Sequence, residues 1–332
     1  MAQNSTHRPV LAGLPWLVAD IGGTNARFGW VGGPEPRVEH VIKLPVADYA
    51  TPALAAREYL ARLRGVLGAR NPAPRRAAIA VATAVGEQIR FTNSPWQFSR
   101  KTLQAELGLE MLLVLNDFEA LALSLPRLRP DQLRAHGKLP VPHGILAVIG
   151  PGTGLGVGGV VESRSGWVAL PGEGGHVTLA ANDDFEAQLL AAVRRDYEHV
   201  SAERLLSGIG LPVLHGALAR VLGQTAAPAS TEAIVASAVA GSDALCVRTM
   251  DLFCALLGGV AGNAALTMGA RGGVFIGGGI VPRLGDGFFS SRFRERFEAK
   301  GRFRGYLEAI PTALITDTLA ALSGAALAIE QE

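Results

Sequence analysis

The fold is decided by the stretch Leu17-Val18-Ala19-Asp20-Ile21-Gly22-Gly23-Thr24-Asn25-Ala26-Arg27-Phe28. Its apolar first half predicts a buried strand, and its glycines predict a tight turn, because glycine tolerates positive φ and lets backbone N–H groups approach an anion closely. A second strand follows the turn. A Walker loop or a dinucleotide fingerprint would require a helix there, so the stretch indicates a phosphate-binding hairpin of another kind.

Asp20, at the end of the first predicted strand, could serve either of two roles. As a single carboxylate beside a phosphate turn it is placed to hold Mg²⁺ through water, since Mg²⁺ prefers one or two carboxylates together with substrate phosphates. The alternative is an ordinary glycine-rich hairpin that Asp20 caps. The hairpin alone does not distinguish these two interpretations.

A second hairpin of the same kind follows at 150–161, where Gly152-Thr153-Gly154-Leu155-Gly156 separates two further apolar strands. Two such hairpins, each leading a cluster of strands, predict two lobes whose turns face each other and hold a phosphate chain from both sides. Pro151 precedes the second turn and has no N–H to donate, so the expected phosphate contacts fall on the glycines after it.

The length and composition agree with two lobes. The 332 residues exceed the ~250 to 300 at which single cores tend to split. Hydrophobic residues make up 48% of the chain and charged residues 18%, which is enough apolar material for substantial cores. The net charge of +2 is small and the basic residues are scattered, so nucleic-acid binding is not expected.

Three features bear on location. The only cysteines, Cys246 and Cys254, lie in one apolar helical stretch, which favours buried thiols in a reducing compartment and therefore the cytoplasm. Residues 1–16 lack the pattern of a signal peptide and are expected to form a flexible lead-in. The uncharged stretch 252–270 approaches the length of a membrane span, but its glycines favour a buried, closely packed helix.

Strand-like and helical runs alternate along the chain, which predicts an α/β protein. Strands are expected at 16–22, 27–32, 38–44, 77–83, 88–93, 111–117, 144–150, 155–163, 166–172, 273–276 and 312–316. Helices are expected at 51–67, in the region 184–222, and at 230–240, 242–268, 288–299 and 317–330.

Asn116-Asp117 ends one predicted strand and starts a helical pattern. Asp117 could therefore be a simple N-cap, or a general base that accepts a hydroxyl proton as the hydroxyl oxygen attacks phosphorus. The glycines Gly277, Gly278 and Gly279 follow another strand. They would leave either a flat surface for adenosine or a flexible turn.

The loop 170–176, Leu-Pro-Gly-Glu-Gly-Gly-His, brings Glu173 and His176 together where glycines prevent a helix. A carboxylate accepts from hydroxyls while a neutral imidazole both donates and accepts, which suits a polyhydroxylated sugar. A zinc site is the competing interpretation, but one Glu and one His form a poor ligand set. Glu203 begins a predicted helix after Ser201, where a first-turn acid or a partner for Arg204 would be a sufficient explanation.

Taken together, these segments resemble the bacterial glucokinases, which belong to the superfamily of hexokinase, actin and heat-shock-chaperone ATPases. The blocks that carry the resemblance span residues ~17 to 332, as two lobes of ordinary domain size would. They are LVADIGGTNARF, FTNSPW, LNDFEALALSLP, GTGLGVG, LPGEGGHV, HVSAERLLSGIGL, GGVFIGGGIVPR and LSGAA.

The resemblance implies a two-lobed, actin-like (ribonuclease H-like) α/β fold with a cleft between a small and a large domain. The small domain would comprise residues 17–127 completed by a C-terminal helix at 318–332, and the large domain residues 128–317. The implied activity is ATP-dependent phosphorylation of D-glucose at the 6-hydroxyl, the first step of glycolysis, by a cytoplasmic enzyme that is often a homodimer. A kinase for another hexose and a non-catalytic sugar or nucleotide sensor remain alternatives.

The resemblance also assigns roles to residues. Asp117 would be the catalytic base. The sugar would be bound by Asn93, Asn116, Asp117, Glu173, His176 and Glu203. ATP would lie against Ala19, Asp20, Ile21, Gly22, Gly23, Thr24, Gly152, Thr153, Gly154, Gly156, Gly277, Gly278 and Gly279, with Mg²⁺ held by Asp20. Two residues depart from the family pattern: Thr83 stands where relatives commonly have proline, and Pro151 precedes the second phosphate turn.

Overall fold

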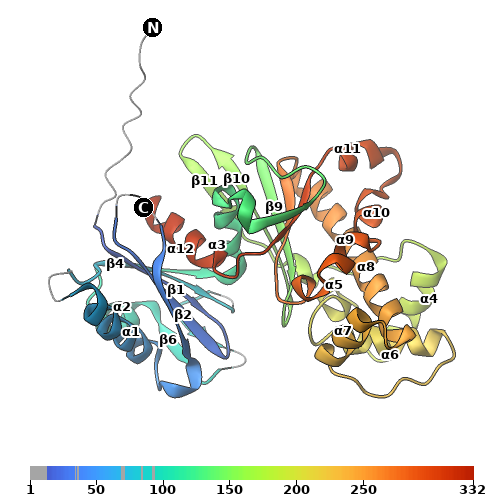
Figure 1. The fold of residues 1–332 in the computed structure, drawn as a ribbon, viewed down its shortest axis with the longest axis horizontal. Helices are drawn as coiled ribbons and strands as arrows, with labels where there is room; N and C mark the ends of the chain where they lie inside the picture. The colour runs from blue at the N-terminus through green and yellow to red at the C-terminus, as the bar shows by residue number, and fades with distance from the viewer. Residues whose placement is uncertain (1–12, 34, 36, 69–71, 84, 92–93) are drawn as a thin grey trace, which may run out of the picture. The chain divides into compact units, whose positions relative to one another are not determined.

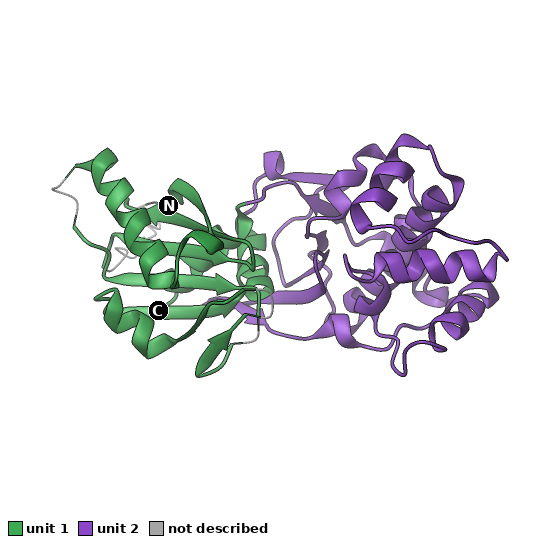
Figure 2. Cartoon of the chain, turned by 90° about the horizontal axis from the view of Figure 1, so that it is seen from below, with its two compact units in different colours: residues 1–127, 319–332 green, residues 128–318 purple. Residues whose placement is uncertain are grey.

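The chain forms two compact units, residues 1–127 with 319–332 and residues 128–318 (Figure 2). The computed structural model describes residues 13–332 except positions 34, 36, 69–71, 84 and 92–93. Below, the two units are called unit 1 and unit 2 in that order.

Unit 1 is built on a five-stranded sheet in the order β3-β2-β1-β4-β7 (Figure 1). Its strands β1 to β3 form an antiparallel meander, whereas β1, β4 and β7 are parallel. Parallel strands require crossover connections, and here helices supply them. The strand bounds are β1 Trp16–Ile21, β2 Asn25–Val31, β3 Glu39–Pro45, β4 Arg76–Val81 and β7 Met111–Asn116, and a separate hairpin pairs β5 Gln88–Arg90 with β6 Gln97–Ser99.

Both faces of this sheet are covered, because successive side chains of a strand point to opposite sides. In β1, Leu17, Ala19 and Ile21 join the cluster that contains side chains of α1 (Pro52–Leu67) and α2 (Arg100–Glu106). Trp16 and Val18 instead join the cluster formed with α12 (Ala320–Glu330). Because Asp20 follows Val18 by two residues in the strand, its side chain lies on the same side of the sheet as α12.

Helix α12 packs against α3 (Asp117–Ser124) at very short range. A Cβ atom added at Gly324 would lie 1.6 Å from the carbonyl oxygen of Ala120, so only glycine allows this approach. The C-terminal helix thereby sets the position of the helix that begins at Asp117.

Unit 2 repeats the plan of unit 1 with a six-stranded sheet, β11-β10-β9-β12-β13-β8. Strands β9 to β11 form the antiparallel meander, β9, β12 and β13 are parallel, and β8 runs antiparallel at the edge. Each of the two predicted hairpins thus leads a meander, as expected from their sequences. The bounds are β8 Leu133–His136, β9 Ile145–Pro151, β10 Leu155–Ser163, β11 Gly166–Leu170, β12 Gly273–Ile276 and β13 Thr312–Ile315.

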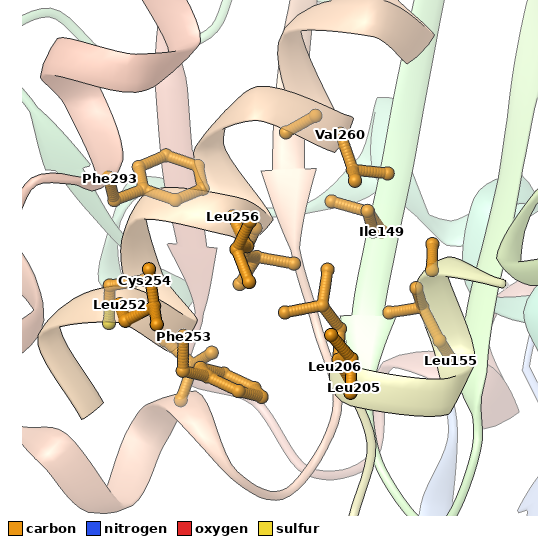
Figure 3. Close-up of a cluster of buried hydrophobic side chains, with 14 of the residues drawn as sticks. Ile149, Leu155, Leu205, Leu206, Leu252, Phe253, Cys254, Leu256, Val260 and Phe293 are labelled. Carbon is orange, nitrogen blue, oxygen red and sulfur yellow. The ribbon is translucent and has the colours of Figure 1, made fainter. Parts of the chain in front are cut away.

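The long helix α8, Ala244–Met268, is the centre of the unit 2 core (Figure 3). It is the one described helix long and apolar enough to cross a membrane, yet 67% of its most apolar window is buried inside the unit. Added Cβ atoms at Gly258 and Gly262 would lie 2.1 and 2.5 Å from the carbonyl oxygens of Phe293 and Phe297 in α10. The predicted buried helix with close glycine contacts is confirmed.

The other helices of unit 2 are short. They are α4 Asp184–Val193, α5 Ala202–Leu205, α6 Leu211–Val221, α7 Thr231–Ala240, α9 Asp286–Ser290, α10 Phe293–Glu298 and α11 Arg304–Glu308. Single 3-10 turns occupy Val46–Asp48, Leu125–Arg127, Pro130–Gln132, Gly174–His176, Val281–Leu284 and Gly301–Phe303.

Some predicted boundaries are wrong. The helix expected at 288–299 is two helices, because Ser291 is extended between them. The last helix begins at Ala320 and not at 317, and Asp317 accepts a hydrogen bond from Gln132. The prediction also missed the short elements α2, α11, β6 and β8, whose few residues show little periodicity.

Candidate functional site

Strands β1, β4 and β7 end together at one edge of the unit 1 sheet. Their register aligns Ile21 with Val81 and Val81 with Asn116. Ligands of open α/β sheets bind outside the carboxyl ends of the strands. The sheet therefore brings Asp20 and Asp117 to the edge where chemistry is expected.

Asp117 is the first residue of α3 but not its N-cap. The cap is Asn116, whose side-chain oxygen accepts from Phe118 N at 2.9 Å and whose own N–H donates to Glu119. The Asn116 amide also donates to the carbonyl oxygen of Thr83 at 3.3 Å, which fixes its orientation. Because Asn116 and Glu119 cap the helix, the N-cap interpretation of Asp117 is wrong.

The carboxyl of Asp117 holds its proton unusually tightly. Its pKa is raised from 3.8 to about 6, chiefly by burial and also by the negative charge of Asp20, while hydrogen bonds such as that from Phe118 N, 2.9 Å long, oppose the rise. A carboxylate in this range is ionised at neutral pH and still basic enough to accept a proton. Such pairs of acids are characteristic of catalytic sites.

Asp20 is paired with Arg27, which lies directly opposite it in the β1–β2 hairpin. One Nη1–Oδ2 distance is 3.0 Å, and the Asp20 side chain is 18% exposed. Burial raises the pKa of Asp20, while the Arg27 guanidinium opposes that rise. Sequence reasoning missed Arg27, although the symmetry of a hairpin about Gly22 to Asn25 indicates this pairing.

The first glycine turn is anchored at both sides. Gly22 N donates to Asn25 O at 2.9 Å, and Val46 N donates to Thr24 O at 2.9 Å. Ala19 and Ile21 point into the core and are fully buried. They can therefore meet a ligand only through their backbone, whereas Gly22, Gly23 and Thr24 are at least partly exposed.

The second glycine turn is shorter than predicted. Leu155 and Gly156 already belong to β10 and pair with Pro151 and Gly150. The turn proper is 152–154, closed by a 2.8 Å hydrogen bond from Gly152 N to Gly154 O.

The third glycine cluster lies beside the second turn. Gly277 N donates to Ile149 O at 2.9 Å, and Ile280 N donates to Pro151 O at 3.2 Å. Gly278 has φ 78°, and a Cβ there would lie 2.3 Å from the carbonyl oxygen of Pro151. Two segments more than a hundred residues apart in sequence thus form one glycine-lined surface of unit 2.

The loop around Glu173 and His176 adjoins the same turn. Glu173 pairs with Val157 in an isolated parallel bridge, and both Glu173 and His176 are exposed. Glu203, on α5, approaches His176 with an Oε1–Nδ1 distance of 4.0 Å. A hollow of about 260 Å³ opens beside His176 and Glu203.

Glu203 does not pair with Arg204, whose guanidinium lies over the Tyr197 ring at 4.4 Å. Its Oε2 instead accepts from Leu155 N at 2.8 Å. The explanation of Glu203 as a partner for Arg204 is wrong, while its place in the first turn of a helix capped by Ser201 is confirmed.

Each unit therefore assembles its own part of the predicted site. Unit 1 contributes Asp20, the first turn, Asn116 and Asp117, and unit 2 contributes the other two glycine segments with Glu173, His176 and Glu203. Asn93 lies outside the described residues, and the cleft expected between the domains stays a prediction. Within the described ranges, no group of three or more His, Cys, Asp or Glu side chains could hold a metal ion.

Comparison with known proteins gives a consistent result. The family model named Glucokinase matches residues 17–332. A glucokinase from Neisseria meningitidis serogroup C is 46% identical over 321 residues, which cover 96% of either chain.

Solved structures agree in fold. A glucokinase from an Antarctic psychrotroph superimposes with a TM-score of 0.87 at 37% identity, covering 96% of this chain and 99% of that one. A glucokinase of the ROK family from Streptomyces griseus, solved with glucose and AMPPNP, has a TM-score of 0.61 at 20% identity, covering 94% and 98%. The second likeness shows the fold alone.

Proposed function

The chain belongs to the glucokinase family, and we propose that it transfers the γ-phosphoryl group of ATP to the 6-hydroxyl of D-glucose. The observation that carries this proposal is Asp117, a carboxylate at the carboxyl edge of parallel strands that is not needed as a helix cap and whose pKa is raised to about 6. A sensor of sugar or nucleotide has no use for such a base.

Asp117 is the general base of the reaction. It accepts the proton of the 6-hydroxyl while the hydroxyl oxygen bonds to the γ-phosphorus and the bond from that phosphorus to the β,γ-bridging oxygen breaks, which releases ADP. Positioning and electrostatic stabilisation supply most of the catalysis in phosphoryl transfer. The two capping hydrogen bonds of Asn116 support this role because they fix the start of α3.

Sugar hydroxyls are recognised by Asn116, Glu173, His176 and Glu203, and by Asn93. The supporting observation is chemical: carboxylates accept from hydroxyls, and amide and imidazole groups both donate and accept. Glu173 and His176 are exposed on one short loop, and Glu203 lies beside them. Lobe closure over the sugar would exclude water, a competing nucleophile.

ATP lies against the three glycine segments. The contact between Gly278 and Pro151 supports the joint use of the segments at 152–156 and 277–279 by one nucleotide. The Streptomyces griseus protein was solved with glucose and AMPPNP, a sugar and an ATP analogue, which correspond to the two proposed substrates.

Magnesium fits this site only as a companion of the nucleotide. Asp20 is a single carboxylate, partly engaged by Arg27, and the described residues offer no larger ligand cluster. That donor set suits Mg²⁺ held by one carboxylate together with phosphate oxygens and water. When bound, the ion would neutralise charge on the phosphates.

The proposal further assigns the enzyme to the cytoplasm, to the first step of glycolysis and to a homodimer. Both cysteines are buried free thiols, which suits a reducing compartment. Sedimentation velocity over a range of protein concentrations tests the dimer.

The decisive assay measures formation of the sugar phosphate with a panel of sugars and phosphoryl donors. D-Glucose, D-mannose, D-fructose and D-glucosamine are each offered with ATP, ADP or polyphosphate, and the product is identified by ³¹P NMR. The expected result is the highest kcat/KM for glucose with ATP, yielding glucose 6-phosphate. A higher kcat/KM with another sugar would identify that sugar as the substrate. Sugar binding without phosphoryl transfer to any sugar would favour a sensor.

A further inference from the structure

Glu203 connects the predicted sugar site to the second glycine turn through one carboxylate. Its Oε2 accepts a 2.8 Å hydrogen bond from Leu155 N, at the end of the turn. Its Oε1 faces His176, 4.0 Å from Nδ1, on the side of the hollow described above. The two oxygens of a carboxylate cannot move independently, so a ligand that reorients one of them also shifts the other.

The glycine at position 154 is required by this carboxylate. A Cβ atom there would lie 2.4 Å from Glu203 Oε2, whereas a Cβ at Gly152, on the same turn, would meet nothing within 4 Å. Neither glycine has a positive φ, so backbone strain does not distinguish them. The turn thus contains one glycine that makes room for Glu203 and one that does not.

Further contacts hold the turn and Glu203 in a single assembly. Gly208 N donates to Gly152 O at 2.8 Å, and Ser207 Oγ donates to Glu203 O at 2.7 Å. Leu155 belongs to the same buried cluster as Leu205 and Leu206, which follow Glu203 (Figure 3). These hydrogen bonds and this packing link the segment of Glu203 directly to the second glycine turn.

The sugar loop joins this assembly as well. A Cβ at Gly175 would lie 2.0 Å from the carbonyl oxygen of Leu155, the residue whose N–H binds Glu203. The carbonyl of Leu155 therefore packs closely against Gly175 in the loop of His176, while its N–H donates to Glu203.

We propose that Glu203 is a positioning residue for the nucleotide as well as a ligand of the sugar. By accepting from Leu155 N it holds the second turn in its phosphate-binding conformation, and its other oxygen makes that conformation sensitive to the sugar. This inference rests on the proposed function. Because the same carboxylate serves the turn and the sugar site, a change in the turn that displaces Glu203 also weakens glucose binding.

The first test compares Gly154→Ala with Gly152→Ala by titration calorimetry with D-glucose and no nucleotide. Gly154→Ala should raise the glucose Kd by about ten-fold or more, the effect of one lost hydrogen bond to a charged group. Gly152→Ala, which adds the same methyl group to the same turn, should change that Kd by less than about two-fold. Equal glucose affinities for the two variants would overturn the proposal.

The second test uses Glu203 itself and measures the Kd of MgADP without sugar. Glu203→Ala removes the acceptor of Leu155 N and should weaken MgADP binding by about five-fold or more. Glu203→Gln keeps an oxygen for that N–H, so MgADP affinity should return close to the wild-type value while glucose affinity stays reduced. An Ala variant that binds MgADP as tightly as the wild-type protein would contradict the positioning role.

Glucose binding and phosphorylation by the wild-type protein distinguish a failure of this inference from a failure of the proposed function. If it phosphorylates glucose but Gly154→Ala binds glucose normally, only the coupling through Glu203 is wrong. If it neither binds nor phosphorylates glucose, the proposed function is wrong, while the MgADP comparison of the Glu203 variants still tests the support of the turn.

Discussion

Replacing Asp117 with Asn should make the protein more stable at neutral pH while removing its catalytic base. The pKa of Asp117 is raised from 3.8 to about 6, chiefly by burial. The folded state therefore favours the neutral acid, and the stability this provides is present below pH ~4 and lost as the pH rises through ~6. The Asn side chain is neutral at every pH and keeps an oxygen for Phe118 N.

The magnitude follows from the two pKa values. Each pH unit between them corresponds to ~1.4 kcal/mol, so ionising Asp117 in the folded protein costs about 3 kcal/mol above pH 7. Asp117→Asn should thus exceed the wild-type free energy of unfolding by up to about 3 kcal/mol at pH 8, and the difference should shrink towards zero below pH 4.

Tryptophan fluorescence during urea unfolding measures this difference from pH 4 to pH 8. Trp16, Trp30 and Trp96 are buried in unit 1, the unit that contains Asp117, so the signal reports mainly on that unit. Asp48→Asn, which removes an exposed carboxylate of the same unit, is the control and should show no comparable pH-dependent gain. A difference between Asp117→Asn and the wild-type protein that does not vary with pH would refute the reasoning.

Three further predictions concern turnover, sugar binding and packing. Because the base must be ionised, kcat/KM for glucose should fall about ten-fold per pH unit below pH ~6; a flat profile down to pH 5 would show that another group accepts the proton. Glu173→Ala should raise the glucose Kd by about ten-fold or more, measured by calorimetry, and an unchanged Kd would remove Glu173 from the sugar site. Gly324→Ala would place a Cβ within 1.6 Å of Ala120 O, so it should lower the free energy of unfolding of unit 1 by about 1–3 kcal/mol, measured by urea unfolding. The control is the neighbouring Ser323→Ala, which should have little effect. Equal stability of the two variants would contradict the close contact of α12 with α3.

Much of the fold was predictable because its strands are short apolar runs that end in glycine or a polar residue. The hairpins around Gly22 to Thr24 and around Gly152 to Gly154 are the clearest case, since each turn sits between two such runs. Helix α8 was predicted as buried because its glycines suit close packing. Helix breaks such as the one at Ser291 were missed, because local periodicity continues across them.

The individual residues of the candidate site were predictable from the sequence, but the contacts between them were not. The turn glycines, Asn116 and Asp117 stand at strand ends, where local sequence already indicates a ligand. The bond between Glu203 and Leu155 joins residues 48 positions apart, and the contact of Gly278 with Pro151 depends on the pairing of β9 with β12. Only tertiary structure reveals such contacts, because no local pattern encodes them.

The most direct test of Asp117 as the base of glucose phosphorylation compares turnover and glucose binding in Asp117→Asn. The account predicts a kcat reduced by about 10²- to 10⁴-fold or more in a coupled assay at pH 7.5, with glucose binding still measurable by calorimetry. Turnover within about ten-fold of the wild-type rate at that pH would contradict it.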